Sequence, residues 1–305
     1  MSVNWRGVLP AMTTPFTPAL ALDVGRVGEH CRRMIDAGCV GVIPGGSLGE
    51  GATLTTDEKA ELIATSVEAV GGDGSVVAGI AALSTAGAVD LAQRAEAAGA
   101  DGLMVLPPYA YSTDWHEMKQ HVAAVISATP LPCILYNNPI AYGTDFLPDQ
   151  IVELAGEHSN LEAVKESSTD VRRVTELRRV AGDRLEILVG VDDLIVEGVA
   201  AGAVGWVAGL VNSFPEESVA LFELARDGRA DEARALNEWF LPLLRLDTVP
   251  KLVQLIKLTQ ELVGQGDWPC RPPRLAVTDA ERDETTVIVQ AALDARPAIA
   301  ARVGG

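Results

Sequence analysis

The sequence lacks the marks of a secreted or membrane-spanning protein. No apolar run approaches the roughly 20 residues that cross a bilayer as a helix. Residues 1–16 contain no basic segment followed by a long apolar stretch, so we expect no secretion signal and a cytoplasmic location. The four cysteines show no CxxC spacing and no nearby histidine cluster, which favours free buried thiols over disulfides or a zinc site.

Positive charge is also scarce. Lysine and arginine together number 24 against 42 aspartate and glutamate residues, which gives a formal net charge of -18 at pH 7. Such a surface repels nucleic acids and anionic membranes, so we expect neither as a partner. A small anionic substrate is repelled at long range too, and its site must therefore supply local hydrogen-bond donors.

The chain has ample material for a folded core. Its 305 residues are 48% hydrophobic and 22% charged, a balance typical of globular enzymes and not of disordered chains. This length exceeds a usual single domain, but barrels of eight βα units routinely use it for one domain.

Short β-branched or aliphatic runs alternate with amphipathic helical patterns, which predicts repeated βα units and a parallel sheet. Three helix-to-strand junctions, at residues 36–41, 97–102 and 200–205, share a glycine that ends the helix just before the strand. Eight such strands predict a closed (β/α)8 TIM barrel of the α/β class. The predicted strands are Gly7–Thr13, Val40–Pro44, Val76–Ile80, Gly102–Leu106, Cys133–Tyr136, Leu161–Lys165, Leu185–Gly190 and Val204–Val207.

After Asn212 the pattern becomes purely helical. We therefore expect residues 1–212 to form the catalytic barrel and residues 213–305 to form a C-terminal helical extension packed on it. The extension could cap one end of the barrel or build a subunit contact. The predicted helices are Val24–Ala37, Thr56–Val70, Thr85–Ala98, Trp115–Ala128 and Val171–Val180 in the barrel, then Pro215–Ala225, Ala230–Leu246, Val249–Val263 and Asp279–Leu293.

Lys165 is the first candidate for chemistry. It is the only lysine of this chain that ends an apolar predicted strand, and active sites of such barrels lie at the carboxyl ends of the strands. A low-dielectric barrel mouth would favour the neutral amine, which attacks carbonyl carbons. The alternative is a lysine that extends from the strand end into solvent.

Two further features lie near Lys165 in the predicted barrel. Tyr136 ends the preceding strand and could relay protons during imine formation, although a tyrosine packed in the barrel wall would look the same. The loop Pro44–Glu50 contains Gly46, Ser47 and Leu48. Its backbone N–H groups and the Ser47 hydroxyl could bind a carboxylate, although a glycine-rich turn is also a common tight connection.

Together these motifs resemble the dihydrodipicolinate synthase and N-acetylneuraminate lyase superfamily of class I aldolases and dehydratases. Gly-Ser-x-Gly-Glu follows the second strand, Tyr-Asn-x-Pro the fifth and Val-Lys-Glu-Ser the sixth. The resemblance spans residues 5–275 and includes Gly190–Asp193 at the seventh strand. It implies that Lys165 forms the imine, that Tyr136 relays protons, and that Ser47 and the Leu48 amide hold a carboxylate.

The resemblance also implies a homo-oligomer, a dimer or a tetramer, with no metal or organic cofactor. The synthases contribute a tyrosine across a subunit contact, and either Tyr109 or Tyr111 could align with it. We favour Tyr111 as the catalytic one, and simple interface packing remains the alternative for both. Two residues depart from the synthase pattern, since Leu48 replaces a threonine and Ala141 stands where the synthases have an arginine.

Longer sequence segments resemble those of one branch of this superfamily, the 1-pyrroline-4-hydroxy-2-carboxylate deaminases of hydroxyproline degradation. They include Gly-Ser-Leu-Gly-Glu, residues 205–212 and residues 246–254. This likeness implies a cyclic imino acid substrate, with 2-oxoglutarate semialdehyde and ammonia as products. The alternatives are a 2-keto-3-deoxy sugar acid aldolase or dehydratase, a pyruvate aldolase like dihydrodipicolinate synthase, and a non-catalytic sensor barrel.

An aldolase and a deaminase would start from the same imine and differ in how the substituent on C4 is held. Candidates for that wall are Tyr142, Ser167, Trp206 and Asn212, and each could equally be a packing residue. The strand-seven residues Gly190 and Asp192 complete the predicted binding set. Asp192 fits a supporting or helix-capping residue better than a base.

Overall fold

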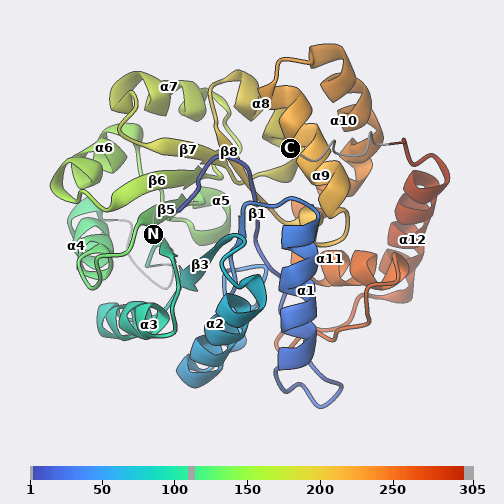
Figure 1. The fold of residues 1–305 in the computed structure, drawn as a ribbon, viewed down its shortest axis with the longest axis horizontal. Helices are drawn as coiled ribbons and strands as arrows, with labels where there is room; N and C mark the ends of the chain where they lie inside the picture. The colour runs from blue at the N-terminus through green and yellow to red at the C-terminus, as the bar shows by residue number, and fades with distance from the viewer. Residues whose placement is uncertain (1–2, 109–113, 299–305) are drawn as a thin grey trace.

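The computed structural model describes residues 3–108 and 114–298, and its centre is an eight-stranded parallel barrel (Figure 1). The strand order is β1-β8-β7-β6-β5-β4-β3-β2, and every neighbouring pair is parallel. A bridge between Ala11 and Ile43 joins the remaining edges and closes the barrel. The strands are β1 (Val8–Pro10), β2 (Gly41–Val42), β3 (Ser75–Ile80), β4 (Gly102–Val105), β5 (Cys133–Asn137), β6 (Leu161–Glu166), β7 (Glu186–Val189) and β8 (Gly205–Ala208).

All eight predicted strands are present, and the predicted TIM barrel is confirmed. The first two are shorter than the sequence pattern predicts. β1 ends at Pro10, which has no N–H to donate to the ladder, and β2 ends three residues before Gly45, where φ is +76°. The hydrophobic pattern of the sequence does not show where these two strands end, because the residues beyond their ends remain buried.

The barrel is built from eight βα units, whose helices surround the strands. Every predicted barrel helix is confirmed within a few residues, whereas α5, α6 and α8 were not predicted. α5 and α8 are too short to show a helical period. The helices are α1 (Val24–Asp36), α2 (Thr56–Val70), α3 (Thr85–Ala97), α4 (Trp115–Ile126), α5 (Pro139–Tyr142), α6 (Pro148–Glu157), α7 (Arg172–Ala181), α8 (Ile195–Ala200) and α9 (Pro215–Arg226).

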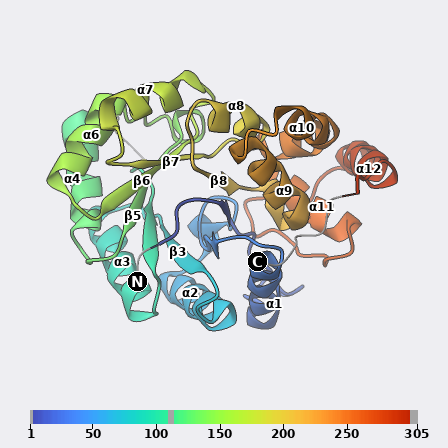
Figure 2. The same ribbon diagram turned by 45° about the horizontal axis from the view of Figure 1, so that its top comes forward.

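Three more helices lie on one side of the barrel, beyond α9 (Figure 2). They are α10 (Ala230–Leu244), α11 (Leu252–Leu262) and α12 (Asp279–Asp294), and the 3-10 turn η4 (Arg245–Asp247) joins the first two. α9 contacts both β1 and α8, so it occupies the place of an eighth barrel helix. The division of the chain at residue 212 stays a prediction.

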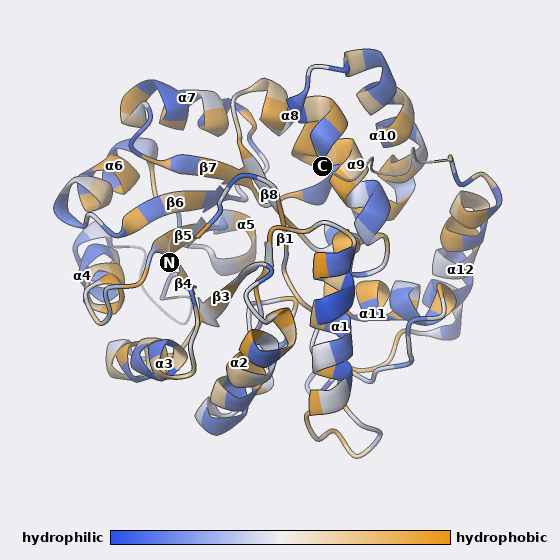
Figure 3. Cartoon of the chain, viewed as in Figure 1, coloured by the Kyte–Doolittle hydropathy of each residue, from blue (hydrophilic) through white to orange (hydrophobic). Residues whose placement is uncertain are grey.

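The core fills the barrel and the layer between strands and helices. β3 is buried at all six positions, as expected of a parallel strand covered on both faces. The helices carry polar residues outward (Figure 3). All four cysteines are free, and three of them are buried, as predicted. Among the described residues no helix is long and apolar enough to cross a membrane.

Candidate active site

Lys165 and Tyr136 are cross-strand neighbours at the carboxyl ends of β6 and β5. The Lys165 Nζ lies 4.0 Å from the centroid of the Tyr136 ring. Each residue is only 5% exposed. The amine therefore does not extend into solvent but lies against the phenol, as the catalytic interpretation of the sequence requires.

Gly190, at the end of β7, leaves the space in which Lys165 lies. A Cβ atom at this position would be 2.6 Å from the Lys165 Cε and would also clash with the Ser167 Oγ. Ser167 is buried, and its hydroxyl has no hydrogen-bond partner among the described residues. A buried hydroxyl without a partner is costly, so Ser167 is suited to meet a substrate atom beside the amine.

The phenol of Tyr136 is held from two directions. Its oxygen accepts a hydrogen bond from Asn138 Nδ2 at 3.0 Å, and the Asn138 Oδ1 caps α5 by accepting from Ala141 N. The ring of Tyr142 packs edge-on against the Tyr136 ring at 5.8 Å. Tyr142 also hydrogen-bonds through its hydroxyl to Ser47, so it joins the loops that follow β5 and β2.

The glycine-rich loop after β2 folds tightly onto β3. A Cβ atom at Gly79 would lie 2.7 Å from the Gly46 nitrogen, so two backbones touch here. Leu48 is 3% exposed and packs in the core, and the role of its amide in holding a carboxylate stays a prediction. On the other side, Thr14 Oγ1 donates to the Gly49 carbonyl at 2.6 Å.

Glu50 ends this loop and was not predicted as a functional residue. Its backbone is left-handed, with φ of +55°, which a non-glycine residue adopts only when the surroundings hold it. Its carboxylate pairs with Lys257 of α11 at 2.6 Å and accepts from the Arg271 backbone N–H at 2.9 Å. Burial lowers the pKa of Lys257, and the charge of Glu50 opposes this effect. The pair anchors the loop to the C-terminal region.

Asp192 and Trp206 are hydrogen-bonded to each other. The indole Nε1 donates to Asp192 Oδ1 at 3.1 Å, and the backbone N–H groups of Gly209 and Leu210 donate to the same carboxylate. Burial raises the pKa of Asp192 to about 6, while these N–H bonds and the charge of Lys165 oppose the rise. This arrangement fits the supporting role that the sequence indicated.

The Asn212 side chain is fully buried and occupied by protein partners. Its Nδ2 donates to the carbonyls of Ala11 and Gly209, and its Oδ1 accepts from Thr13 N and the His30 ring. Because the Arg33 guanidinium donates to His30 Nδ1, the other ring nitrogen carries the proton and donates to Asn212. Burial lowers the pKa of His30 to about 3. Whether Asn212 also contacts substrate stays a prediction.

Two predicted site residues, Tyr109 and Tyr111, lie outside the described residues. Within the described part of the chain, no cluster of histidine, cysteine, aspartate or glutamate side chains could hold a metal ion.

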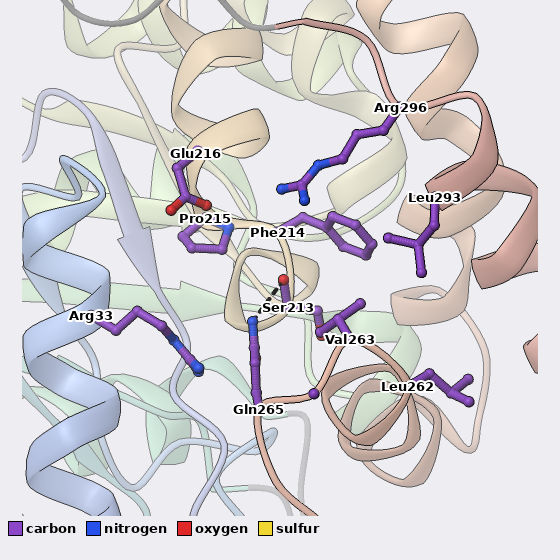
Figure 4. A pocket seen from close by; sticks show the side chains of 11 residues that line it. Arg33, Ser213, Phe214, Pro215, Glu216, Leu262, Val263, Gln265, Leu293 and Arg296 are labelled. Atoms are coloured by element: carbon purple, nitrogen blue, oxygen red, sulfur yellow. Dashed lines mark hydrogen bonds between the residues drawn. The ribbon is translucent and has the colours of Figure 1, made fainter.

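A separate cleft of about 450 Å³ lies between α1, α9, α11 and α12 (Figure 4). Arg33 and Arg296 reach toward it from opposite sides. Both guanidinium groups already have protein partners, since Arg33 donates to His30 and Arg296 pairs with Glu217. None of the predicted site residues that the structure describes lines this cleft, so it is separate from the predicted site at Lys165.

A lysine and a tyrosine buried side by side at the carboxyl ends of two barrel strands define a class of protein. The chain is an enzyme of the class I lyases, which bind their substrates through a lysine Schiff base. More particularly, it belongs to the Dihydrodipicolinate synthetase family, whose model matches residues 4–292.

Relatives and solved structures agree with this assignment. A 4-hydroxy-tetrahydrodipicolinate synthase of Methanopyrus kandleri is 34% identical over 274 residues, 90% of this chain and 91% of that protein. The corresponding synthase of Natronomonas pharaonis is 38% identical over 77% of this chain and 79% of its own.

Among solved structures, the synthase of Methylacidiphilum fumariolicum superposes with a TM-score of 0.92 at 28% identity, covering 95% of this chain and 97% of that one. A prophage protein of the same family from E. coli, solved in complex with pyruvate, gives 0.89 at 25% identity, with coverage of 95% and 99%. These names support a synthase-like aldolase better than the deaminase that the sequence phrases favoured.

Proposed function

We propose that the protein is a lyase in which the Lys165 amine forms an imine with C2 of a small 2-oxo acid. The observation that carries this proposal is the position of Lys165 Nζ, buried and 4.0 Å from the centre of the Tyr136 ring. The names of the relatives favour a pyruvate aldolase as the reaction type.

The surrounding groups support each stage of imine formation. Tyr136, held by Asn138, can protonate the carbonyl oxygen as the amine attacks and then release it from the carbinolamine as water. Backbone amides of the loop at Gly46–Leu48, with the Ser47 hydroxyl, can hold the carboxylate. The resulting protonated imine withdraws electrons from C3, so that a C3–H or C3–C4 bond breaks.

A second candidate is the deaminase, and one observation favours it. Ala141 lies in α5 where the synthases carry an arginine for a second carboxylate, and its methyl group cannot form that ion pair. Here Lys165 would open the ring of 1-pyrroline-4-hydroxy-2-carboxylate at C2. Loss of the C3 proton and the C4 hydroxyl would follow, and hydrolysis of an imine at C5 would release ammonia and 2-oxoglutarate semialdehyde, with net consumption of one water.

Borohydride trapping tests the imine. The purified enzyme is incubated with pyruvate and sodium borohydride, digested, and analysed by mass spectrometry. We expect a reduced adduct on Lys165 and none in Lys165→Ala. If the wild-type enzyme gives no adduct with pyruvate or with hydroxypyrroline carboxylate, the proposal fails and a non-catalytic sensor barrel becomes the better interpretation.

Product analysis then separates the two reactions. The enzyme is supplied with 2-keto-3-deoxy acids or with hydroxypyrroline carboxylate, and both pyruvate and ammonia are measured. Pyruvate from the first substrates without ammonia from the second supports the aldolase. Ammonia from the second supports the deaminase of hydroxyproline degradation.

We further propose that the region beyond residue 212 is an extension packed on the barrel. We also propose that the enzyme assembles as a homo-oligomer, a dimer or a tetramer, and the support for the oligomer is the family likeness alone. Light scattering after size-exclusion chromatography measures the mass directly, and a mass of one 32.1 kDa chain would contradict the proposal.

A further inference from the structure

Asp247 brings a carboxyl group from the C-terminal region to the end of strand β8. It closes the turn η4, and its Oδ1 is buried without a hydrogen-bond partner among the described residues. A Cβ atom at Gly209 would overlap this carboxyl group and would lie 2.8 Å from its Oδ2. The glycine therefore leaves the space that the Asp247 side chain fills.

Asp192 binds the backbone of the same glycine, Gly209. Its carboxylate accepts from Gly209 N at 3.1 Å and from Leu210 N at 2.7 Å. Two carboxyl groups thus meet at one residue, and the charge of Lys165 acts on both of them. Because Gly209 directly follows β8, both groups lie at the carboxyl end of the barrel, the end at which Lys165 lies in β6.

The two carboxyl groups differ in what satisfies them. Asp192 accepts N–H bonds that stabilise its ionised form, whereas Asp247 Oδ1 accepts none from the described residues. Burial and the charge of Asp192 raise the pKa of Asp247 well above its ordinary value, Asp193 adds to this, and Lys165 opposes it. The nearby Arg245 is engaged with Asp193 at 3.5 Å. These contacts therefore favour the proton on Asp247 and the charge on Asp192.

We propose that Asp247 is a catalytic residue that donates a proton to the oxygen on C4 of the imine-bound substrate. This inference rests on the proposed function, because it assumes the imine at Lys165. Tyr136 lies against the amine and is placed to serve the oxygen that leaves C2. The oxygen on C4 needs a donor of its own, and Asp247 Oδ1 is a buried carboxyl oxygen with no partner among the described residues.

Both candidate reactions need this proton. In aldol addition, C3 of the enamine bonds to the aldehyde carbon, the carbonyl π pair moves to oxygen, and that oxygen takes the Asp247 proton to become the C4 hydroxyl. In dehydration, a water molecule takes the C3 proton, the C3–H electrons form a C3=C4 bond, and the C4–O pair leaves with oxygen. That oxygen takes the Asp247 proton and departs as water. Solvent then reprotonates Asp247.

Asp247→Asn tests the proposal, since it preserves size and removes the proton. We expect kcat to fall about 100-fold or more, as for loss of a general acid, and the alkaline limb of the kcat profile to disappear. Exchange of the pyruvate C3 protons with deuterium oxide, followed by NMR, needs the imine but no C4 oxygen. It should continue at the wild-type rate, as should borohydride trapping.

Asp227→Asn, an exposed aspartate at the end of α9, is the matched control and should turn over as the wild type does. A kcat for Asp247→Asn within about threefold of the wild type would overturn the inference, because a general acid contributes at least about 100-fold. Loss of C3 exchange together with turnover would also overturn it, because Asp247 would then act in a step that precedes the chemistry at C4. Failure of the wild type to form any imine would instead remove the proposed function itself.

Discussion

The Glu50 carboxylate and the Lys257 ammonium lie 2.6 Å apart although 207 residues separate them in the chain. Both side chains are almost completely buried, at 0% and 3% exposure. Glu50 ends the loop that we propose holds the substrate carboxylate, and Lys257 belongs to α11. The pair therefore makes the shape of that loop depend on a helix outside the barrel.

We expect Lys257→Met to lower the free energy of unfolding by about 3–5 kcal/mol, because it leaves Glu50 as a buried charge without its partner. Urea denaturation followed by circular dichroism measures this change. The double variant Glu50→Gln/Lys257→Met removes both charges and should be more stable than Lys257→Met alone. If the double variant loses the sum of the two single losses, the two side chains are not coupled and the prediction is wrong.

Tyr136→Phe should slow imine formation about 100-fold or more while the ring stays in place over the amine. Trapping rates with pyruvate and borohydride measure this step directly. Lys165→Ala, which cannot form the imine, gives the background rate of the assay. Equal trapping rates for wild type and Tyr136→Phe would exclude the phenol as the proton relay.

Gly190→Ala should abolish most activity although it changes none of the reacting groups chemically. The added methyl group would lie 2.6 Å from Lys165 Cε and clash with Ser167 Oγ, so the amine must move from its place. Gly156→Ala in α6, where a Cβ meets nothing within 4 Å and the backbone is not left-handed, controls for loss of glycine alone. Trapping on Lys165 and turnover should fall together. A Gly190→Ala enzyme with normal kcat would show that the amine tolerates displacement.

His30 should make the protein sensitive to mild acid. Its pKa is about 3 in the folded protein against an ordinary value of 6.5, so below pH 6.5 the unfolded chain binds a proton that the folded chain refuses. The free energy of unfolding therefore falls as pH falls, by at most about 1.4 kcal/mol per pH unit from this group.

Asp192 acts in the opposite direction, because its pKa of about 6 lies above its ordinary value and its protonation stabilises the folded state as pH falls. A comparison with His30→Gln isolates the histidine. Between pH 6.5 and 5, the stability of the wild type relative to this variant should decrease. A difference that stays constant over this range would contradict the assignment.

Local patterns made the barrel and its lysine predictable. The alternation of strand and helix is visible within windows of a dozen residues, and Lys165 stands out because it follows a short apolar strand. Tyr136 follows from the same rule, since adjacent strands end at the same edge. None of these inferences needs contacts between distant parts of the chain.

The groups that were missed depend on such distant contacts. Nothing near Glu50 in the sequence indicates that Lys257 will neutralise it, and nothing near Asp247 indicates that Gly209 will make room for it. A lysine within the apolar pattern of α11 and an aspartate in a short turn were the only local signals. Both required the three-dimensional structure to be interpreted.

Strand β1 pairs with β8, and Trp206 N donates to the Gly7 carbonyl across that seam. A chain emerging from the ribosome cannot make this closure until about two thirds of it has been synthesised. The anchors at Lys257 and Arg271 arrive later still. Lys165 and Tyr136 are thus synthesised before these anchors, and a nascent chain carries its nucleophile before the loop at Gly46–Leu48 is fixed in place.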